Sequence, residues 1–529
     1  MRMTRGAMLR LMSAATPEAS ADVRISRWVY AVAIVYFAAQ MATSTRYGYF
    51  RDALYYLTCS HHLAFGYVDL PPLFPFVAWI GRHTLGTSLP ALIFWPALAG
   101  AARIVLVALF ARELGAGAFG TVLAAVLGTT PGVWWVIDHQ FAMNAFEPLF
   151  WIGLALVVLR MIKTGNPKLW LVFGLVAGLG VENKYSIAFF AFALLLGVLL
   201  SPARKLLFTP WILAGGAIAF GLFLPNLIWN VQHHWPFLEL MNNIRVTGKD
   251  VILPPGAYLA QQVLMMNPAS LPFWFAGLLY YFARGGRAYR AFGWTFVITI
   301  FLFMAMHGKD YYSAPAYTLV LAAGGLAGER LLERVGRPGL RAILRSACFA
   351  WLIIFVVLLL PLVLPVLSLE AFVRYQSHLP FQPAKTERSF AGAVLPQYYA
   401  DELPWEEMVA AVARVYHALP AEQQARTGVF GNNYGEAAAV DFFGPKYGLP
   451  QSISGHQNYF FWGPRNYTGE SLIVLGDSVE GARRSCASVE IGATLNNPYA
   501  LFYENRPVLL CRGLRWNLQT DWQRMKFWR

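Results

Sequence analysis

Residues 343–368 read ILRSACFAWLIIFVVLLLPLVLPVLS, and Arg345 is the only charged residue in this stretch. An α-helix needs about 20 consecutive apolar residues to cross the hydrocarbon core of a bilayer. The stretch is therefore predicted to span a membrane. It also divides the chain, because the sequence before it is largely apolar, whereas residues 369–529 contain 15 basic and 15 acidic residues and no comparable stretch.

Ten further apolar stretches precede this one. Only 13% of all residues are charged, whereas a soluble domain has roughly 25%. We therefore expect an α-helical polytopic membrane protein with about eleven transmembrane helices. The other ten helices are predicted near residues 28–45, 89–111, 118–137, 146–162, 169–182, 185–200, 209–229, 257–282, 291–306 and 311–328.

Basic residues are distributed unevenly over the loops between these helices. With residues 1–27 as a cytoplasmic leader, the inner segments carry 19 Lys and Arg and the outer loops carry seven. This asymmetry follows the positive-inside bias. An odd number of spans then places residues 369–529 on the extracytoplasmic face. The net charge of +14 lies entirely within residues 1–368, which indicates membrane loops and argues against a nucleic-acid partner.

The first outer loop, residues 46–88, is long but not polar. Its apolar residues recur at helical spacing on both sides of Pro71-Pro72. This pattern predicts two short amphipathic helices in the membrane interface, separated by the two prolines. Most acidic residues and all seven histidines of the membrane region also fall on the outer side, where ionisable groups near apolar spans often mark a functional cavity.

The segment after residue 368 alternates between strand-like and helix-like stretches. Apolar runs at 428–431, 471–475, 485–491 and 507–511 alternate with helical patterns at 405–418 and 434–443. Such alternation predicts a small α/β domain. Cys486 and Cys511 either pair there or stay unpaired. A polar and aromatic set suits either sugar binding or ordinary packing, namely Asn432, Asn433, Tyr434, His456, Asn458, Tyr459 and Trp462.

Four segments of the membrane region carry a resemblance to a known family. The first lies in the first loop and contains YFRDALYYL and HLAFGYVDLPPL, and the others are FAMNAFEPLFW at 141–151, GLGVENKYS at 178–186 and HGKDYYSAPAYTLVLAAG at 307–324. In order and spacing they resemble the polyprenyl-phosphate-sugar-dependent membrane glycosyltransferases. These include the bacterial relatives of protein O-mannosyltransferases and the lipid A aminoarabinose and galacturonosyl transferases, also classed as glycosyltransferase family 39. The resemblance implies a GT-C fold, with a transmembrane glycosyltransferase module at 28–368 and a variable extracytoplasmic domain at 369–529.

The resemblance also implies a catalytic carboxylate in the first loop. The family has an Asp-Glu pair at this position, and here Asp52 matches the Asp whereas Ala53 replaces the Glu. Asp52 is thus the expected base that takes a proton from the acceptor hydroxyl. The missing Glu leaves the second acidic position open, with Glu147, Asp138 and Asp69 as candidates. A Lys that precedes the Pro-Pro pair in the family is also absent here.

Cations near the outer helix ends are the expected partners of a donor phosphate. The candidates for phosphate binding are the cations Lys184, Lys309, Arg46 and Arg51, together with the Tyr311 phenol. Each of two candidates has a simpler alternative: Lys184 only extends its ammonium to the membrane interface, and Glu147 only caps a helix. The adjacent histidine pairs 61–62 and 233–234 do not define a zinc site, so no metal ligand is assigned. A divalent ion at Asp52 is compatible with the sequence but not required, and the cofactor is left unknown.

The predicted function is an inverting hexosyl- or pentosyltransferase of a bacterial inner (plasma) membrane. It would move a sugar from a polyprenyl-phosphate donor to lipid A, to another cell-envelope glycan or to a protein. One alternative is a transporter or flippase of lipid-linked sugars, which should show related halves and midplane charges. The other is a non-catalytic member of the same fold, which the Ala53 replacement would favour. The sequence does not name the sugar, the acceptor, the prenyl length or the oligomeric state.

Overall fold

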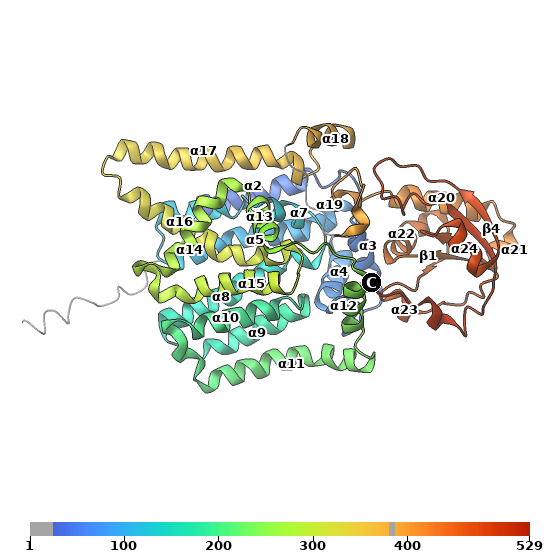
Figure 1. Ribbon diagram of the computed structural model, residues 1–529, viewed down its shortest axis with the longest axis horizontal. Helices are drawn as coiled ribbons and strands as arrows, with labels where there is room; N and C mark the ends of the chain where they lie inside the picture. Colours follow the sequence, from blue (N-terminus) through green and yellow to red (C-terminus); the bar gives the residue numbers. More distant parts are fainter. Residues whose placement is uncertain (1–24, 380–386) are drawn as a thin grey trace, which may run out of the picture.

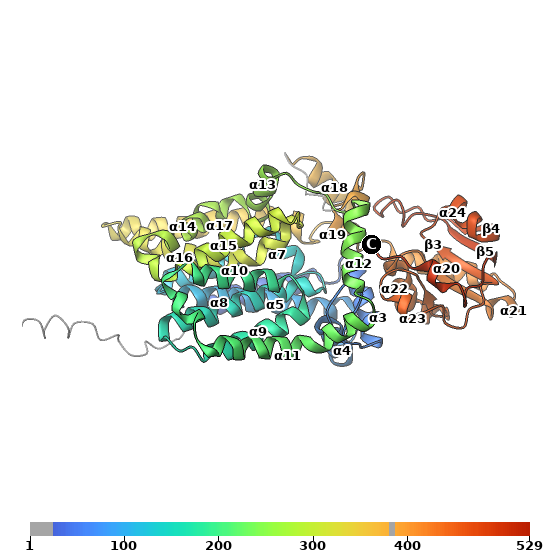
Figure 2. The same ribbon diagram turned by 60° about the horizontal axis from the view of Figure 1, so that its bottom comes forward.

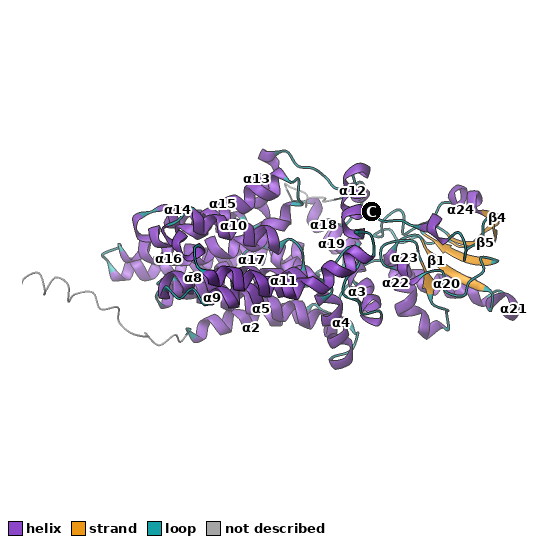
Figure 3. Cartoon of the chain, turned by 90° about the horizontal axis from the view of Figure 1, so that it is seen from below, coloured by secondary structure: helices purple, strands orange, loops and turns teal. Residues whose placement is uncertain are grey.

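The computed structural model describes residues 25–379 and 387–529. A bundle of roughly parallel helices forms one half of the molecule, and a small α/β domain lies at one end of it (Figure 1). Helices α3, α4 and α12 lie at that same end, next to the domain (Figure 2). Helices make up the bundle, and the strands are confined to the domain (Figure 3). The predicted fold class is confirmed in both halves.

The bundle helices follow the predicted apolar stretches closely. They are α2 (Arg27–Ala42), α5 (Leu89–Glu113), α6 (Ala118–Leu127), α7 (Gly132–Ile137), α8 (Glu147–Thr164), α9 (Leu169–Asn183), α10 (Ile187–Leu199), α11 (Pro210–Gln232), α13 (Pro255–Met265), α14 (Leu271–Phe282), α15 (Arg290–Ala305), α16 (Tyr317–Glu333) and α17 (Pro338–Val363).

Length and composition qualify some of these helices as membrane spans on their own. Within the described residues, five helices are long and apolar enough to cross a membrane: α5, α8, α11, α15 and α17. Two of these spans include a preceding turn, and α13 with α14 forms a bent sixth candidate. Shorter apolar helices are α2, α6, α9 and α10. The chain is thus an integral membrane protein, and the count of eleven crossings stays a prediction.

Two predicted helices are broken in the structure. The stretch predicted as one helix at 257–282 is bent by 87° between α13 and α14. Asn267 adopts a positive φ of 65° and caps the next turn by accepting a hydrogen bond from the Ala269 amide, and Pro268 cannot continue the preceding helix. The stretch at 118–137 is divided into α6 and α7 before Pro131 in the same way.

The first outer loop forms the two predicted helices, α3 (Arg51–His61) and α4 (Leu73–Thr84), with the proline pair between them. Two further outer helices, α12 (Pro236–Thr247) and α18 (Leu369–Ser377), lie near the domain. One face of α12 buries Leu240, whereas Leu238, Met241 and Val246 stay exposed. Such an amphipathic helix suits a membrane interface.

The domain contains a five-stranded mixed sheet of order β2-β1-β3-β5-β4. Strands β1, β2 and β3 are parallel, with Val429 opposite Ser452 and Ile473, whereas β5 runs antiparallel to both β3 and β4. The strands are β1 (Thr427–Gly431), β2 (Ser452–Ile453), β3 (Ser471–Leu475), β4 (Cys486–Ala493) and β5 (Val508–Leu514). The domain helices are α19 (Gln397–Ala400), α20 (Trp405–His417), α21 (Ala421–Gln424), α22 (Tyr434–Phe443), α23 (Tyr459–Trp462) and α24 (Val479–Ser485).

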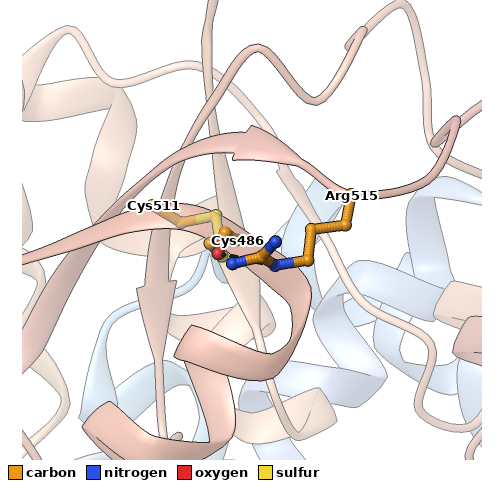
Figure 4. Close-up of a disulfide and its surroundings, with 3 residues drawn as sticks. All are labelled: Cys486, Cys511 and Arg515. Atoms are coloured by element: carbon orange, nitrogen blue, oxygen red, sulfur yellow. Dashed lines mark hydrogen bonds between the residues drawn. A yellow bond between two sulfur atoms is a disulfide. The ribbon is translucent and has the colours of Figure 1, made fainter.

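A disulfide links Cys486 at the start of β4 to Cys511 in β5 (Figure 4). The Arg515 guanidinium donates a hydrogen bond of 3.1 Å to the carbonyl oxygen of Cys486 beside it. Of the two arrangements that the sequence left open for these cysteines, the structure shows the paired one. Disulfides persist in oxidising compartments.

The two faces of the sheet are covered differently. Helices α20 and α22 pack on one face, and α3 and α4 belong to the same hydrophobic core. The C-terminal segment and Leu240 of α12 cover the other face. The domain is therefore joined to the first outer loop by a shared core, and this junction positions the candidate site.

Candidate active site

Asp52 lies in the first turn of α3, where the helix dipole favours a carboxylate. The Arg51 amide, at the start of this helix, donates a hydrogen bond of 2.9 Å to the carbonyl oxygen of Asp401. The eight residues that follow Asp52 are all buried, whereas the Asp52 side chain keeps 28% of its surface exposed. The carboxylate is therefore held on a rigid element but remains accessible.

The α/β domain supplies a direct partner for this carboxylate. Asn433 and Glu436 form a capping box that starts α22, so Tyr434 is the first residue of that helix. The Tyr434 hydroxyl donates a hydrogen bond of 2.6 Å to Oδ1 of Asp52. Burial is the main reason that the pKa of Tyr434 lies well above 10, so this phenol stays a donor at neutral pH.

Arg51 connects Asp52 to a second carboxylate. Its guanidinium lies 3.1 Å from Oδ1 of Asp401 and 3.7 Å from Oδ1 of Asp52, and it stacks over the Tyr434 ring at 5.4 Å. Gly435 leaves room for this, because a Cβ there would lie 2.6 Å from the Arg51 side chain. These contacts pair Arg51 with groups of the protein itself, so a donor phosphate at the predicted position would have to share the Arg51 guanidinium with Asp401.

A second group of charges surrounds Lys309, just before the short 3₁₀ helix η5 (Asp310–Ala316). The Lys309 ammonium lies 2.8 Å from Oε1 of Glu387 and 3.4 Å from Oδ1 of Asp250, and Lys249 lies 3.8 Å from Oε2 of Glu387. Burial is the largest influence on the pKa of Lys309 and lowers it, but Tyr311, Glu387 and neighbouring groups together raise it well above its usual value. Lys309 is therefore a permanent cation.

Tyr311 links this group to Asp52. Burial, ahead of the charges of its neighbours, raises the pKa of Tyr311 well above 10, and the charges that act on it include those of Lys309, Glu387 and Asp52. A neutral phenol thus lies within electrostatic reach of the predicted base and of the predicted phosphate cation. The two groups of charges therefore lie within electrostatic reach of one phenol.

Lys184 and Glu147 form a third group on the same side. The Lys184 ammonium lies 2.8 Å from Oε2 of Glu147 and donates to Oδ1 of Asn144 at 2.7 Å. Ser186 donates to the other Glu147 oxygen. Lys184 also lies 4.6 Å from the centre of the Tyr312 ring, and Tyr312 is the neighbour of Tyr311. The alternatives proposed for these two residues, an interfacial lysine and a helix cap only, do not describe this buried ion pair.

Asp69 lies between the two outer-loop helices. It accepts a hydrogen bond of 3.0 Å from the Tyr55 hydroxyl of α3. Burial raises the pKa of Asp69 to about 7, and the charge of Asp52 adds to the shift. Asp69 is thus an acid near Asp52 that changes its protonation state close to neutral pH. Arg46 is exposed and borders a small crevice with Phe50, Ala53 and His139.

Asp138 has different surroundings from the other acidic candidates. It is fully buried, and its Oδ2 lies 2.8 Å from Arg103 of α5 and 2.7 Å from the Tyr36 hydroxyl of α2. Arg103 also stacks on Trp134 at 3.8 Å. This pair ties three helices together and offers no surface to a substrate. The role of second carboxylate therefore suits Asp69 better, because Glu147 is also buried in an ion pair, with 4% of its side chain exposed.

Most of the polar and aromatic set of the domain packs against the first outer loop. The Val68 amide donates to Oδ1 of Asn458 at 2.7 Å, the Asn458 amide donates to the Tyr55 hydroxyl at 3.3 Å, and His62 stacks on Trp462 at 4.5 Å. Packing thus accounts for these members, whereas Tyr434 reaches Asp52. Among the described residues, no group of three or more His, Cys, Asp and Glu side chains is arranged to hold a metal ion.

Four participants of the site lay outside the sequence prediction: Lys249, Glu387, Asp401 and the Tyr434 contact. Lys249 carried a signal, because it is an outer-loop cation close to an acidic residue. Glu387 and Asp401 carried none, since they lie in the polar part of the chain and meet the site only through the fold.

Comparisons with known proteins concern the sequence and the fold. Residues 69–229 match the family described as dolichyl-phosphate-mannose-protein mannosyltransferase. Lipid A galacturonosyltransferase RgtD of Rhizobium johnstonii is 32% identical over 191 residues, which cover 35% of this chain and 39% of that relative. The aligned part is thus well under half the length of either protein, and it supports the resemblance that the motifs carry.

Solved structures show the fold over almost the whole chain. ArnT from Cupriavidus metallidurans bound to undecaprenyl phosphate matches with a TM-score of 0.59 at 12% identity, over 91% of this chain and 97% of that one. The apo state of the same protein gives 0.57 at 13% identity with the same coverage. The chain therefore has the GT-C fold that the sequence predicted.

Proposed function

We propose that this protein is an inverting membrane glycosyltransferase that uses a polyprenyl-phosphate-linked sugar. The observation that supports the proposal is that Asp52, with its Tyr434 partner, and the cations around Lys309 both act on the charge environment of Tyr311, at the end of the bundle next to the α/β domain. ArnT, which shares the fold, was solved with undecaprenyl phosphate, and RgtD is named a lipid A galacturonosyltransferase. Both names support a lipid-phosphate donor and a cell-envelope acceptor such as lipid A, another glycan or a protein.

Asp52 acts as the general base in this proposal. It accepts the proton of an acceptor hydroxyl while the hydroxyl oxygen attacks the anomeric carbon of the donor. The bond between that carbon and the phosphate oxygen breaks, and polyprenyl phosphate leaves with the electron pair. Attack from the face opposite the phosphate inverts the anomeric configuration. Tyr434 orients the Asp52 carboxylate from the other side.

The lysines stabilise the leaving phosphate. Lys309, together with Lys249, is placed to neutralise the charge that develops on the phosphate oxygen, and Tyr311 can donate a hydrogen bond to it. Lys184, paired with Glu147, belongs to the third group of charges described above. The prenyl chain can stay in the bilayer beside the bundle, because apolar side chains such as Phe220 and Ile228 of α11 are exposed there.

We further propose that the N-terminus is cytoplasmic and that residues 369–529 lie in the periplasm. The excess of basic residues on the inner loops supports this orientation, and so does the disulfide between Cys486 and Cys511. A reporter fused after Arg529 tests it. A reporter enzyme that works only outside the cytoplasm should be active when it is fused after Arg529. Activity of a strictly cytoplasmic reporter at the same position would reject the orientation.

Asp52→Asn tests the catalytic assignment. In a strain that lacks the parent gene, envelope lipids and glycans should lose one sugar, and the parent chain should restore it. A positioned general base contributes ~10²–10⁴-fold in rate, so Asp52→Asn should restore little, whereas exposed Glu422→Gln should restore all. The purified Asp52→Asn protein should still bind undecaprenyl phosphate, and Lys309→Gln should bind it more weakly. Full restoration by folded Asp52→Asn would remove Asp52 from the mechanism.

A further inference from the structure

Glu387 occupies the two lysines that the proposed mechanism assigns to the lipid phosphate. Its Oε1 lies 2.8 Å from Lys309 and its Oε2 lies 3.8 Å from Lys249. The two lysines come from separate loops, yet each faces a different oxygen of one carboxylate. Only 7% of the Glu387 side chain is exposed. A carboxylate that bridges two ammonium groups satisfies them much as two phosphate oxygens would.

The fold holds this segment without help from the carboxylate. Residues 250 and 387 form an antiparallel bridge, and the Arg388 amide donates to the carbonyl oxygen of Lys249 at 3.0 Å. Lys309 also has a second counterion, because Asp250 lies 3.4 Å away. Backbone contacts fix the chain, and Asp250 already compensates one charge. The Glu387 carboxylate is thus a second counterion for Lys309 and the ion-pair partner of Lys249.

This negative charge is permanent. Burial raises the pKa of Glu387, but Lys309, Lys249 and Arg51 lower it further, to about 2. As found, two lysines face two carboxylates, so the group is neutral. A lipid phosphate that reaches these lysines must share them with Glu387 or displace it.

The lipid donor and the lipid product differ in the negative charge with which they compete against Glu387 for the two lysines. A polyprenyl-phosphate sugar is a phosphodiester with one negative charge, whereas the released polyprenyl phosphate is a monoester with about −1.5 to −2 charges at pH 7. Without Glu387, Asp250 would compensate only one of the two lysines, and the remaining positive charge would hold the more highly charged product more tightly than the donor. Repulsion by a fixed neighbouring carboxylate acts more strongly on the more charged product.

We propose that Glu387 is an internal counter-anion that competes with the lipid phosphate and promotes release of the polyprenyl phosphate product. This inference rests on the proposed function, because it takes Lys309 and Lys249 as the phosphate site. As the product leaves, the carboxylate returns to both lysines, and neither a covalent bond nor a proton has to move. Glu387 does not touch the reacting atoms in this scheme.

Glu387→Gln tests the proposal, since it keeps the size and a hydrogen-bonding oxygen but removes the charge. Binding of undecaprenyl phosphate to the purified protein in lipid nanodiscs should tighten about tenfold, within the range of coupling between contacting charges. Turnover should fall together with KM, because release becomes slower. Glu387→Asp keeps the charge and should bind like the parent, and exposed Glu422→Gln controls for a general loss of negative charge.

A double variant shows whether the effect passes through the lysine. In the Lys309→Gln background, Glu387→Gln should tighten binding by clearly less than in the parent. A parent protein that does not bind undecaprenyl phosphate would reject the proposed function itself. A parent that binds it, combined with a folded Glu387→Gln protein that binds equally or more weakly, would overturn only the counter-anion. Glu387→Ser provides the same readout if the amide variant does not fold.

Discussion

The Tyr434 hydroxyl gives the sharpest test of the contact between the α/β domain and the predicted base. Tyr434→Phe removes one oxygen, and the hydrogen bond that this oxygen donates goes to Asp52 at 2.6 Å. The ring should stay in place, because it packs against Tyr55 at 4.8 Å and against His456 at 5.1 Å. The substitution therefore changes the surroundings of Asp52 with little change in packing.

The magnitude follows from the charge and the exposure of Asp52. A hydrogen bond to an ionised group contributes about 1.5–3 kcal/mol, and the 28% exposure of the Asp52 side chain favours the low end. A loss of about 1.4 kcal/mol of transition-state stabilisation lowers a rate about tenfold. Because the hydroxyl holds and orients the Asp52 carboxylate, its loss should lower the rate of sugar transfer about tenfold at neutral pH.

The assay is the rate of sugar transfer at pH 7, measured on purified protein in nanodiscs. Tyr459→Phe is the matched control, because Tyr459 is also a buried phenol of the domain that contacts α3. Its hydroxyl lies 2.9 Å from Asp441 and 3.4 Å from Thr58. The control should keep the parent rate even if it unfolds at a lower temperature. A Tyr434→Phe protein that transfers sugar at the parent rate would refute the reasoning.

Three further predictions concern stability. Arg103→Leu leaves Asp138 unpaired in the bundle and should destabilise the protein by about 3–5 kcal/mol, seen as a lower midpoint of thermal unfolding in detergent; an unchanged midpoint would contradict the buried pair. The pKa of folded Asp69 is raised to about 7 by burial, so the folded state keeps a proton that the unfolded state has lost, and stability falls as pH rises from about 4 to about 7. Asp69→Asn should therefore flatten the dependence of unfolding on pH between 5 and 7, and an equally steep dependence would count against it. Cys486→Ser opens a 25-residue loop closed with Cys511 and should cost about 3 kcal/mol, and reduction of the parent should give the same loss.

The sequence predicted the elements that depend on local patterns. Helical spacing on both sides of Pro71-Pro72 was enough to predict α3 and α4, and strand-length apolar runs located β1 and β3. The bend between α13 and α14 was missed because hydropathy is continuous across it. Asn267-Pro268 was the available signal, since a proline ends the preceding helix and asparagine tolerates a positive φ.

The site was predictable only where one residue carried the information. Motifs and the predicted side of the membrane selected Asp52, Lys309, Lys184 and Glu147 as separate candidates, and the ion pair between the last two is a finding of the structure. No local sequence pattern predicts the contacts of Glu387, because its lysine partners come from two other loops that only the fold brings close to it. Arg103 did carry a signal that was overlooked: a cation within an apolar span requires a buried partner, and this partner is the reason that Asp138 is unavailable to a substrate.

The shared core implies that the α/β domain and the catalytic helix cannot be separated. Leu54 and Tyr55 of α3 are buried together with Trp405 of α20, so removal of the domain would expose a large apolar surface on the first outer loop. It would also leave Arg51 without Asp401 and Asp52 without Tyr434. The orientation of the predicted base is thus set from both sides of the junction. A variable domain at this position can alter catalysis without contributing a base of its own, because it controls how the carboxylate is held.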